Sequence, residues 1–103
     1  SKNMILSANG QNIYPEEIEA AVNNQPYIIE SVVVNRGARL VALVYADAEK
    51  AKAEGTDLEA YKAVIMAEVN KSMPSYSKIN IVEYMDQPFE KTPKMSIKRF
   101  MYK

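Results

Sequence analysis

The sequence contains neither cysteine nor histidine, and these two absences exclude whole classes of chemistry. Without cysteine there is no disulfide and no thiolate nucleophile, and the composition fits a reducing compartment, so we expect a cytoplasmic protein. Without histidine there is no imidazole for acid–base catalysis, and with neither residue we expect no metal site of the zinc type. Any chemistry of this chain must therefore use lysine, arginine, carboxylates, hydroxyls or the backbone.

Long hydrophobic runs are also missing. The longest, LVALVYA at 40–46, is far shorter than the roughly 20 residues that cross a bilayer, and the chain does not open with a basic region followed by an apolar stretch, as a signal peptide does. The length of 103 residues predicts one domain. The first residue is Ser1 rather than Met, so we expect the chain to be processed or cut from a longer protein.

The first quarter of the sequence predicts a small hairpin followed by a helix. Asn9-Gly10 is a strong turn signal, and Pro15 suits the first position of a helix that Pro26 ends. No strong capping side chain precedes Pro15. The acids at the start of this helix could suggest a metal, but we expect a solvated first turn instead; they are Glu16, Glu17 and Glu19.

The remainder predicts a sheet with helices on it. Two β-branched runs, 28–34 and 40–46, predict an antiparallel pair at the centre of the sheet, and the second is apolar on both faces, so both faces should be covered. A short exposed helix at 47–54, an amphipathic helix at 57–72 and a third strand at 79–85 follow. The fold class is α+β, with a small N-terminal β-hairpin and then a three-stranded sheet on which two or three helices pack.

A local excess of charge ends the chain, in EKTPKMSIKRFMYK at 90–103, although the whole sequence balances 13 basic against 13 acidic residues. A nucleic-acid patch would use such cations on phosphates, but the neutral chain has no interleaved basic and aromatic residues along a strand pair, so we expect no nucleic acid. A membrane-surface segment would use Phe100, Met101 and Tyr102 beside the lysines; that contact stays open, although nothing else indicates it. On charge alone, a solvated tail is the default.

Two motifs at opposite ends change this interpretation. SKNMILSANGQNIYPEEIEAAV at 1–22 resembles the opening of the C-terminal domain of the acyl-adenylate-forming enzymes, which include acyl-CoA synthetases, peptide-synthetase adenylation domains and luciferases. The pattern there is Gly-Arg-x-(Asp/Lys)-x-x-Ile, then Gly, then Ile-x-Pro-x-Glu-Ile-Glu. PSYSKI at 74–79 and KTPKMSIKRF at 91–100 are similar to the family's Pro-x-Tyr-x-x-Pro/Ile and Thr-x-x-Gly-Lys-Ile-x-Arg segments. The positions that match the first motif are Lys2, Ile5, Gly10, Ile13, Pro15, Glu17, Ile18 and Glu19.

The resemblance implies that residues 1–103 are the mobile C-terminal lid of a larger acyl-CoA ligase whose N-terminal adenylation domain is absent from this chain. Such enzymes join a carboxylic acid to ATP, giving acyl-AMP and pyrophosphate, and then transfer the acyl group to a thiol, here coenzyme A. ATP, Mg²⁺ and CoA would serve the full-length enzyme, and this domain would bind none of them firmly and be inactive alone. The KRFMY ending is most similar to long-chain fatty acid–CoA ligases.

The resemblance also implies site residues. Lys2 falls on the hinge, and Ala8, Asn9 and Gly10 fall on the loop that lines the access path of CoA. In the last motif the family's glycine falls on Met95, and its adenylation lysine falls on Ser96.

A serine hydroxyl cannot replace the positive charge of that lysine, but Lys94 and Lys98 flank Ser96 by two residues each. On an extended segment these three side chains would share a face, with Cα shifts of only about 6.6 Å. We therefore hypothesise that Lys94 or Lys98 is the catalytic lysine. The rival hypothesis is a lid that lacks this lysine and adenylates slowly.

Two other functions remain in view. A free-standing α+β binding module would dock an acidic partner through the basic tail, and it predicts a start codon just upstream of Ser1. A peptide-synthetase lid predicts a carrier-protein domain downstream of Lys103.

Overall fold

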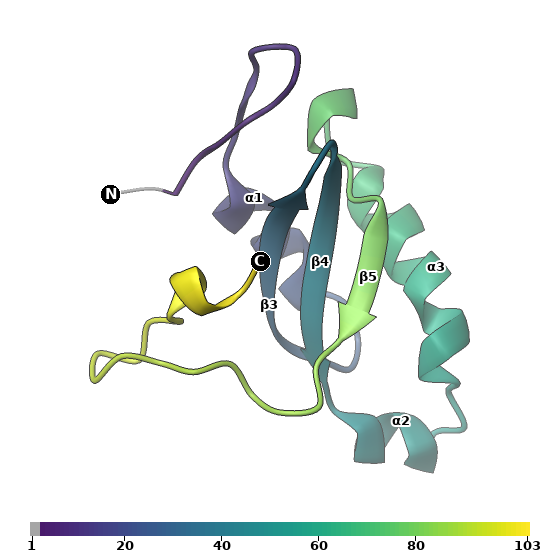
Figure 1. Ribbon diagram of the computed structural model, residues 1–103. Coiled ribbons are helices and arrows are strands. Elements are labelled where there is room, and N and C mark those ends of the chain that lie inside the picture. The colour runs from purple at the N-terminus through teal and green to yellow at the C-terminus, as the bar shows by residue number, and fades with distance from the viewer. Residues whose placement is uncertain (1–2) are drawn as a thin grey trace.

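The strands of the computed structural model, which describes residues 3–103, form two separate sheets (Figure 1). A small antiparallel hairpin joins β1 (Ile5–Leu6) to β2 (Asn12–Ile13). The main sheet has the order β3-β4-β5, and its strands are β3 (Ile28–Arg36), β4 (Arg39–Ala46) and β5 (Ile81–Tyr84). With the helices described below, this confirms the predicted α+β fold.

The main sheet differs from the expected arrangement in its central strand and in the length of β5. β3 and β4 are antiparallel as predicted, but β5 pairs in parallel with β4, so that β4 alone is central and β3 lies at an edge. β5 is also shorter than the predicted 79–85. Before β5 begins, the backbone of Ile79 bonds a side chain instead of a strand: its N–H donates to Asn70 Oδ1 and its C=O accepts from Asn70 Nδ2. The side chain of Asn80 bonds β4, where Asn80 Oδ1 accepts from Leu40 N at 2.9 Å.

The helices begin where the sequence predicts. α1 (Pro15–Asn23) starts with Pro15 and has no side-chain cap, and α2 (Ala48–Ala53) is the expected short helix. α3 (Leu58–Asn70) is capped by Asp57, whose carboxylate accepts from Glu59 N at 3.0 Å. None of the helices in the described part of the chain combines the length and the hydropathy that a membrane span requires.

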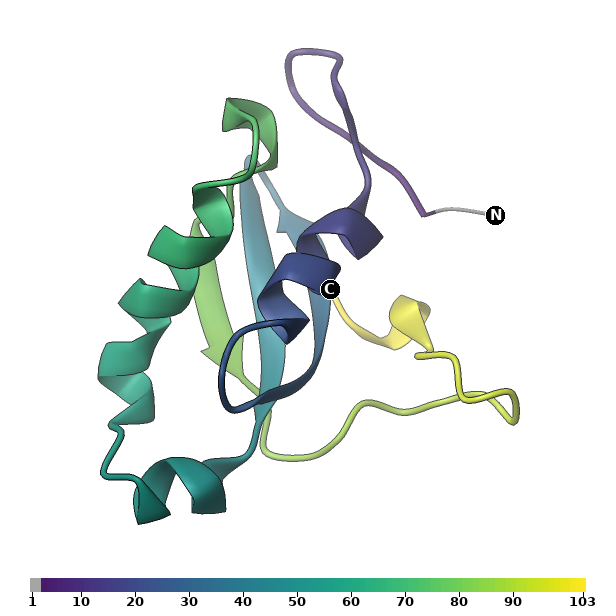
Figure 2. The ribbon, with the colours of Figure 1, turned by 180° about the vertical axis from the view of Figure 1, so that it is seen from behind.

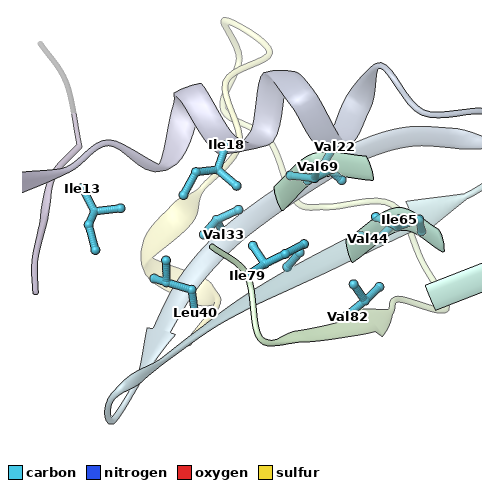
Figure 3. Close-up of a cluster of buried hydrophobic side chains, with 11 residues drawn as sticks. Ile13, Ile18, Val22, Val33, Leu40, Val44, Ile65, Val69, Ile79 and Val82 are labelled. Atoms are coloured by element: carbon cyan, nitrogen blue, oxygen red, sulfur yellow. The ribbon is translucent and has the colours of Figure 1, made fainter. Parts of the chain in front are cut away.

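One face of the main sheet packs against α1 and α3, which lie side by side in front of the sheet in Figure 2. Figure 3 shows the side chains of this first core pointing into the space between the helices and the sheet. Its largest fully buried members include Ile18, Val22 and Ile65. The buried residues of the first core are Ile13, Ile18, Val22, Val33, Leu40, Ala42, Val44, Ile65, Val69, Ile79 and Val82.

The other face carries a second, smaller core that no helix of the α1–α3 set covers. Its buried residues are Val32, Val34, Val41, Leu43 and Phe89, with Ile97 and Tyr102 packed against them. Phe89, Ile97 and Tyr102 all belong to the C-terminal segment, which in Figure 1 leaves the lower end of β5, loops out beside β3 and returns to end at β3. The prediction that both faces of β4 are covered is confirmed, and the cover on the second face is the tail itself.

Candidate functional site

The basic tail is a folded hairpin rather than a free end. Thr92 N donates to Ser96 O at 2.8 Å, Lys98 N donates to Glu90 O at 2.8 Å, and Lys91 and Ile97 form an antiparallel bridge between them. We call residues 90–98 the tail hairpin. A turn closes it, in which Met95 N donates to Thr92 O at 2.8 Å.

This turn corrects the geometry expected for the lysines around Ser96. The segment 94–98 is not extended throughout, because Lys94 lies within the turn. Ile97 packs into the second core, so Ser96 and Lys98, its neighbours on the returning arm, face the other way by strand alternation. A groove between this arm and the start of α1 is lined by Ser96, Lys98 and Glu16 but not by Lys94. The structure therefore brings Ser96 and Lys98 together and leaves Lys94 at the tip.

The turn also bears on how the last motif is aligned. Met95 has φ of 67°, in the left-handed region that costs a residue with a side chain about 1–2 kcal/mol. The alignment puts the family's glycine at this position, and glycine is the residue that adopts this backbone without strain. The backbone thus supports the register that places Ser96 at the family's lysine position.

Met95→Gly should therefore stabilise the domain, by about 0.5–1 kcal/mol once the greater freedom of glycine in the unfolded chain is subtracted. Urea unfolding would measure it. Met101→Gly is the matched control, since Met101 is also exposed but has no positive φ, and it should destabilise. Destabilisation by Met95→Gly would contradict the strain that the turn implies.

A partly buried ion pair joins the two ends of the chain. The Arg99 guanidinium donates from both terminal nitrogens to the two carboxylate oxygens of Glu19, one of the bonds being 2.8 Å long. Glu19 is only 6% exposed, so the expectation that it belongs to a solvated helix turn is wrong. The hydrogen bonds to Glu19, against the opposing effect of burial, raise the pKa of Arg99.

Sequence reasoning missed this pair, although a signal was present. Glu19 lies three residues before Val22, a spacing that places the two side chains on the same side of α1, and both are buried. An acid on an apolar helix face requires a partner. The partner stands 80 residues away in the sequence, and no local pattern connects the two.

A second ion pair holds the outgoing arm of the tail hairpin. Lys91 Nζ lies 2.8 Å from Glu30 Oε1, and Glu30 Oε2 also accepts from Phe89 N at 3.0 Å. Among the salt bridges within residues 3–103, Lys91 and Arg99 are the tail cations that take part. Lys94 and Lys98 form none there, which leaves their charges available for an anion.

The start of the described chain is attached to α1. Asn3 Nδ2 donates to Glu16 Oε2 at 2.7 Å, and Asn3 N donates to the same oxygen at 3.3 Å. Burial opposes ionisation of the Glu16 carboxyl, but the hydrogen bonds from Asn3 and the charge of Arg99 outweigh it and lower the pKa of Glu16 from its ordinary 4.5. The predicted hinge residue, Lys2, lies outside the described residues.

The contact between Asn3 and Glu16 predicts a pH-dependent stability. A carboxyl whose pKa is lowered by folding contributes stability above its unfolded pKa, and the contribution is lost as the pH falls through the folded value. The wild type should therefore be more stable than Asn3→Ala at pH 7, and the difference should shrink as the pH falls below 4.5. Urea unfolding at several pH values tests this, and a difference that persists in acid would contradict it.

The turn of the β1–β2 hairpin is the second predicted site. Gly10 has φ of +80°, and Gly10 N donates to Ser7 O at 3.0 Å, which closes the turn. No atom lies within 4 Å of the position that a Cβ on Gly10 would take, so the turn is open to solvent. Ala8 and Asn9 line a cavity of about 420 Å³ that also touches the β3–β4 turn and Tyr76.

The two predicted sites are separate. In both ribbon views the β1–β2 hairpin and the tail hairpin project from different ends of the domain, and the first described residues lie between them (Figures 1 and 2). A domain that rotated about its first residues would therefore present one site or the other to a neighbouring surface. Within residues 3–103 no group of three or more acidic side chains is placed to hold a metal ion.

Comparison with known proteins gives a family and a fold. The family of AMP-binding enzyme C-terminal domains matches residues 2–102. No curated protein sequence matches the chain.

Three similar solved structures illustrate the fold. A Mycobacterium tuberculosis fatty acyl CoA synthetase has a TM-score of 0.70 at 22% identity, over 95% of this chain and 18% of that one. The anthranilate CoA ligase AuaEII in complex with anthranoyl-AMP has a TM-score of 0.79 at 19% identity, over 97% and 18%. The adenylation domain of a Mycobacterium chelonae carboxylate reductase has a TM-score of 0.78 at 20% identity, over 96% and 17%. The chain thus spans less than a fifth of each of these proteins.

Proposed function

The chain belongs to the family of AMP-binding enzyme C-terminal domains, and from this we propose that it is the mobile lid of a larger ATP-dependent acyl-CoA ligase. The observation that carries the proposal is the family match over residues 2–102, on a chain that spans less than a fifth of similar solved enzymes. Its partner would be its own N-terminal adenylation domain, which supplies the sites for ATP and the acid. The lid alone would be inactive.

The reaction has two steps. The carboxylate attacks the α-phosphate of ATP, which forms acyl-AMP and releases pyrophosphate, and the CoA thiol then displaces AMP to give the thioester. We propose a long-chain fatty acid as the substrate. The KRFMY ending supports it, as does the similarity in fold to a fatty acyl CoA synthetase, although ligases for other acids have the same fold.

Lys98 is our choice for the cation of the first step. Negative charge builds on the carboxylate and the α-phosphate during transfer, and a preorganised ammonium offsets it. Lys98 shares a groove with Ser96, where the family's lysine would stand, whereas Lys94 lies in the turn outside that groove. Both chain neighbours of Lys98 are also held in place: Ile97 packs against the second core, and Arg99 forms its ion pair with Glu19.

The β1–β2 hairpin would serve the second step. Its turn is open, and Ala8, Asn9 and Gly10 there carry little bulk, so their backbone could lie close to a pantetheine chain. Lys2 would be the hinge about which the domain rotates between the steps. The described residues offer no acidic cluster for Mg²⁺, so the ion that accompanies ATP would be held by the N-terminal domain and the nucleotide.

Pyrophosphate exchange tests this proposal. The full-length protein should incorporate labelled pyrophosphate into ATP when a carboxylic acid is present, and a panel of acids of increasing chain length should show the highest rate with long-chain acids. The reading frame upstream of Ser1 is a second test, since it should encode an adenylate-forming domain that ends in Gly-Arg. Absence of exchange with every acid would overturn the proposal.

The second candidate is the lid of an enzyme that transfers the acyl group of acyl-AMP to the thiol of a carrier protein. The similarity to a carboxylate reductase adenylation domain favours it, as a reductase is not a CoA ligase. This candidate, like a peptide-synthetase lid, predicts a carrier domain after Lys103 and acyl transfer to that domain rather than to CoA.

A further inference from the structure

We propose that Glu19 is a positioning residue for the adenylation step: through Arg99 it holds the returning arm of the tail hairpin so that Lys98 faces the groove. This inference rests on the proposed function. It adds a role for a carboxylate that would itself touch neither ATP nor the acid.

The Glu19 carboxylate occupies the free edge of the main sheet. β3 pairs with β4 on one side only, and the backbone N–H of Val33 on its other side donates to Glu19 Oε2 at 2.7 Å. Glu19 comes from α1, on one face of the sheet, while Arg99 comes from the tail on the opposite face. The carboxylate thus joins a helix, a strand edge and the tail at one point.

The bonding pattern makes this junction rigid. Both oxygens of Glu19 accept from the planar guanidinium of Arg99, and a two-point contact of this kind fixes orientation as well as distance. The side chains of Glu19 and Arg99 are 8% and 25% exposed, so water competes weakly. By contrast, the surface pair Arg36–Glu83 is 41% and 45% exposed and joins through a single contact.

The contact between Glu19 and Arg99 affects the position of Lys98, the residue before Arg99. The returning arm is fixed at Ile97 by the second core and at Arg99 by Glu19, which leaves Lys98 between two anchored residues. The outgoing arm does not depend on Glu19, because Phe89 is buried and Tyr102 Oη accepts from Glu90 N at 2.6 Å. Ile97 and the bond from Lys98 N to Glu90 O would remain, so loss of the ion pair should release the returning arm at its Arg99 end and displace the ammonium of Lys98.

Glu19→Gln in the full-length enzyme tests this role. Glutamine keeps the size and one oxygen for Val33 N–H, but it loses the charge and the two-point contact with Arg99. Acyl-AMP formation should slow at least tenfold through kcat, with KM for ATP changed less than threefold. Acyl transfer to CoA from supplied acyl-AMP should stay within twofold, because the turn of the β1–β2 hairpin projects from a different end of the domain.

The controls separate positioning from stability. Lys91→Met removes the other ion pair of the tail, of comparable exposure at its cation, and acyl-AMP formation should change less than threefold. Arg99→Lys keeps the charge but not the two-point geometry, and it should show the same split between the half-reactions with a smaller loss; it carries the test if Glu19→Gln fails to fold.

Equal losses in both half-reactions, or an equal loss in Lys91→Met, would show a general structural role and overturn the inference. A wild-type enzyme without pyrophosphate exchange would instead overturn the proposed function. A wild-type enzyme with exchange, and variants that match it, would overturn only the role of Glu19.

Discussion

Lys98→Ala in the full-length enzyme should slow acyl-AMP formation by about 100-fold, the loss expected when one preorganised charge is removed from a transferring group. Lys98 faces the groove that Ser96 lines and forms no salt bridge within residues 3–103. Lys94→Ala is the matched control, since it removes the same side chain from the turn of the same hairpin, and it should change the rate less than threefold. Single-turnover formation of acyl-AMP is the measurement.

Ser96→Lys extends this test in the direction of a gain. It introduces a lysine at the position where we expect the family's adenylation lysine, and in the Lys98→Ala background it should recover much of the lost rate. If Lys98→Ala costs less than about tenfold, which is roughly 1.4 kcal/mol of barrier, Lys98 is not the adenylation cation. A larger loss in Lys94→Ala than in Lys98→Ala would reassign the role to Lys94.

Phe89→Ala should destabilise the domain by about 3–5 kcal/mol, the range for truncation of a buried phenylalanine. Phe89 is 3% exposed in the second core, and its ring stacks edge to face on Tyr102 with centroids 4.9 Å apart. Phe100→Ala is the matched control: it removes the chain's only other phenylalanine, which is 76% exposed, and should cost less than about 0.5 kcal/mol. Urea unfolding of the domain measures both.

The comparison of the two phenylalanines decides whether the tail is part of the fold. Without Phe89 the second core loses the one fully buried residue that the tail contributes to it, and the attachment of the tail hairpin to the sheet should weaken. Equal and small effects of both substitutions would mean that the tail does not cover this face.

Local patterns predicted the secondary structure well, for identifiable reasons. Pro15, Asp57 and Gly10 act through their own backbone or on adjacent N–H groups, so their effects can be read without a tertiary structure. The continuous apolar run of β4 likewise requires cover on both of its faces. The pattern could not show which segment covers the second face of β4. That segment is the tail, which lies about 50 residues further along the chain.

The candidate site was predicted less completely. The family motifs located the tail segment, but Lys94 and Lys98 could not be distinguished on an assumed extended chain. The turn that separates them depends on a left-handed backbone at Met95. A methionine gives no sign of such a turn, because residues with a side chain rarely adopt this backbone conformation. The burial of Glu19 was missed because its partner, Arg99, is supplied by the tertiary fold.

The central claim is that one small lid serves two steps with two separate sites, and a pair of substitutions in the full-length enzyme tests it most directly. Each variant is assayed for acyl-AMP formation and, separately, for acyl transfer to CoA from supplied acyl-AMP. Lys98→Ala should impair the first and spare the second. Ala8→Trp, which adds bulk to the open β1–β2 turn, should do the reverse. Parallel losses in both assays for both variants would contradict the account.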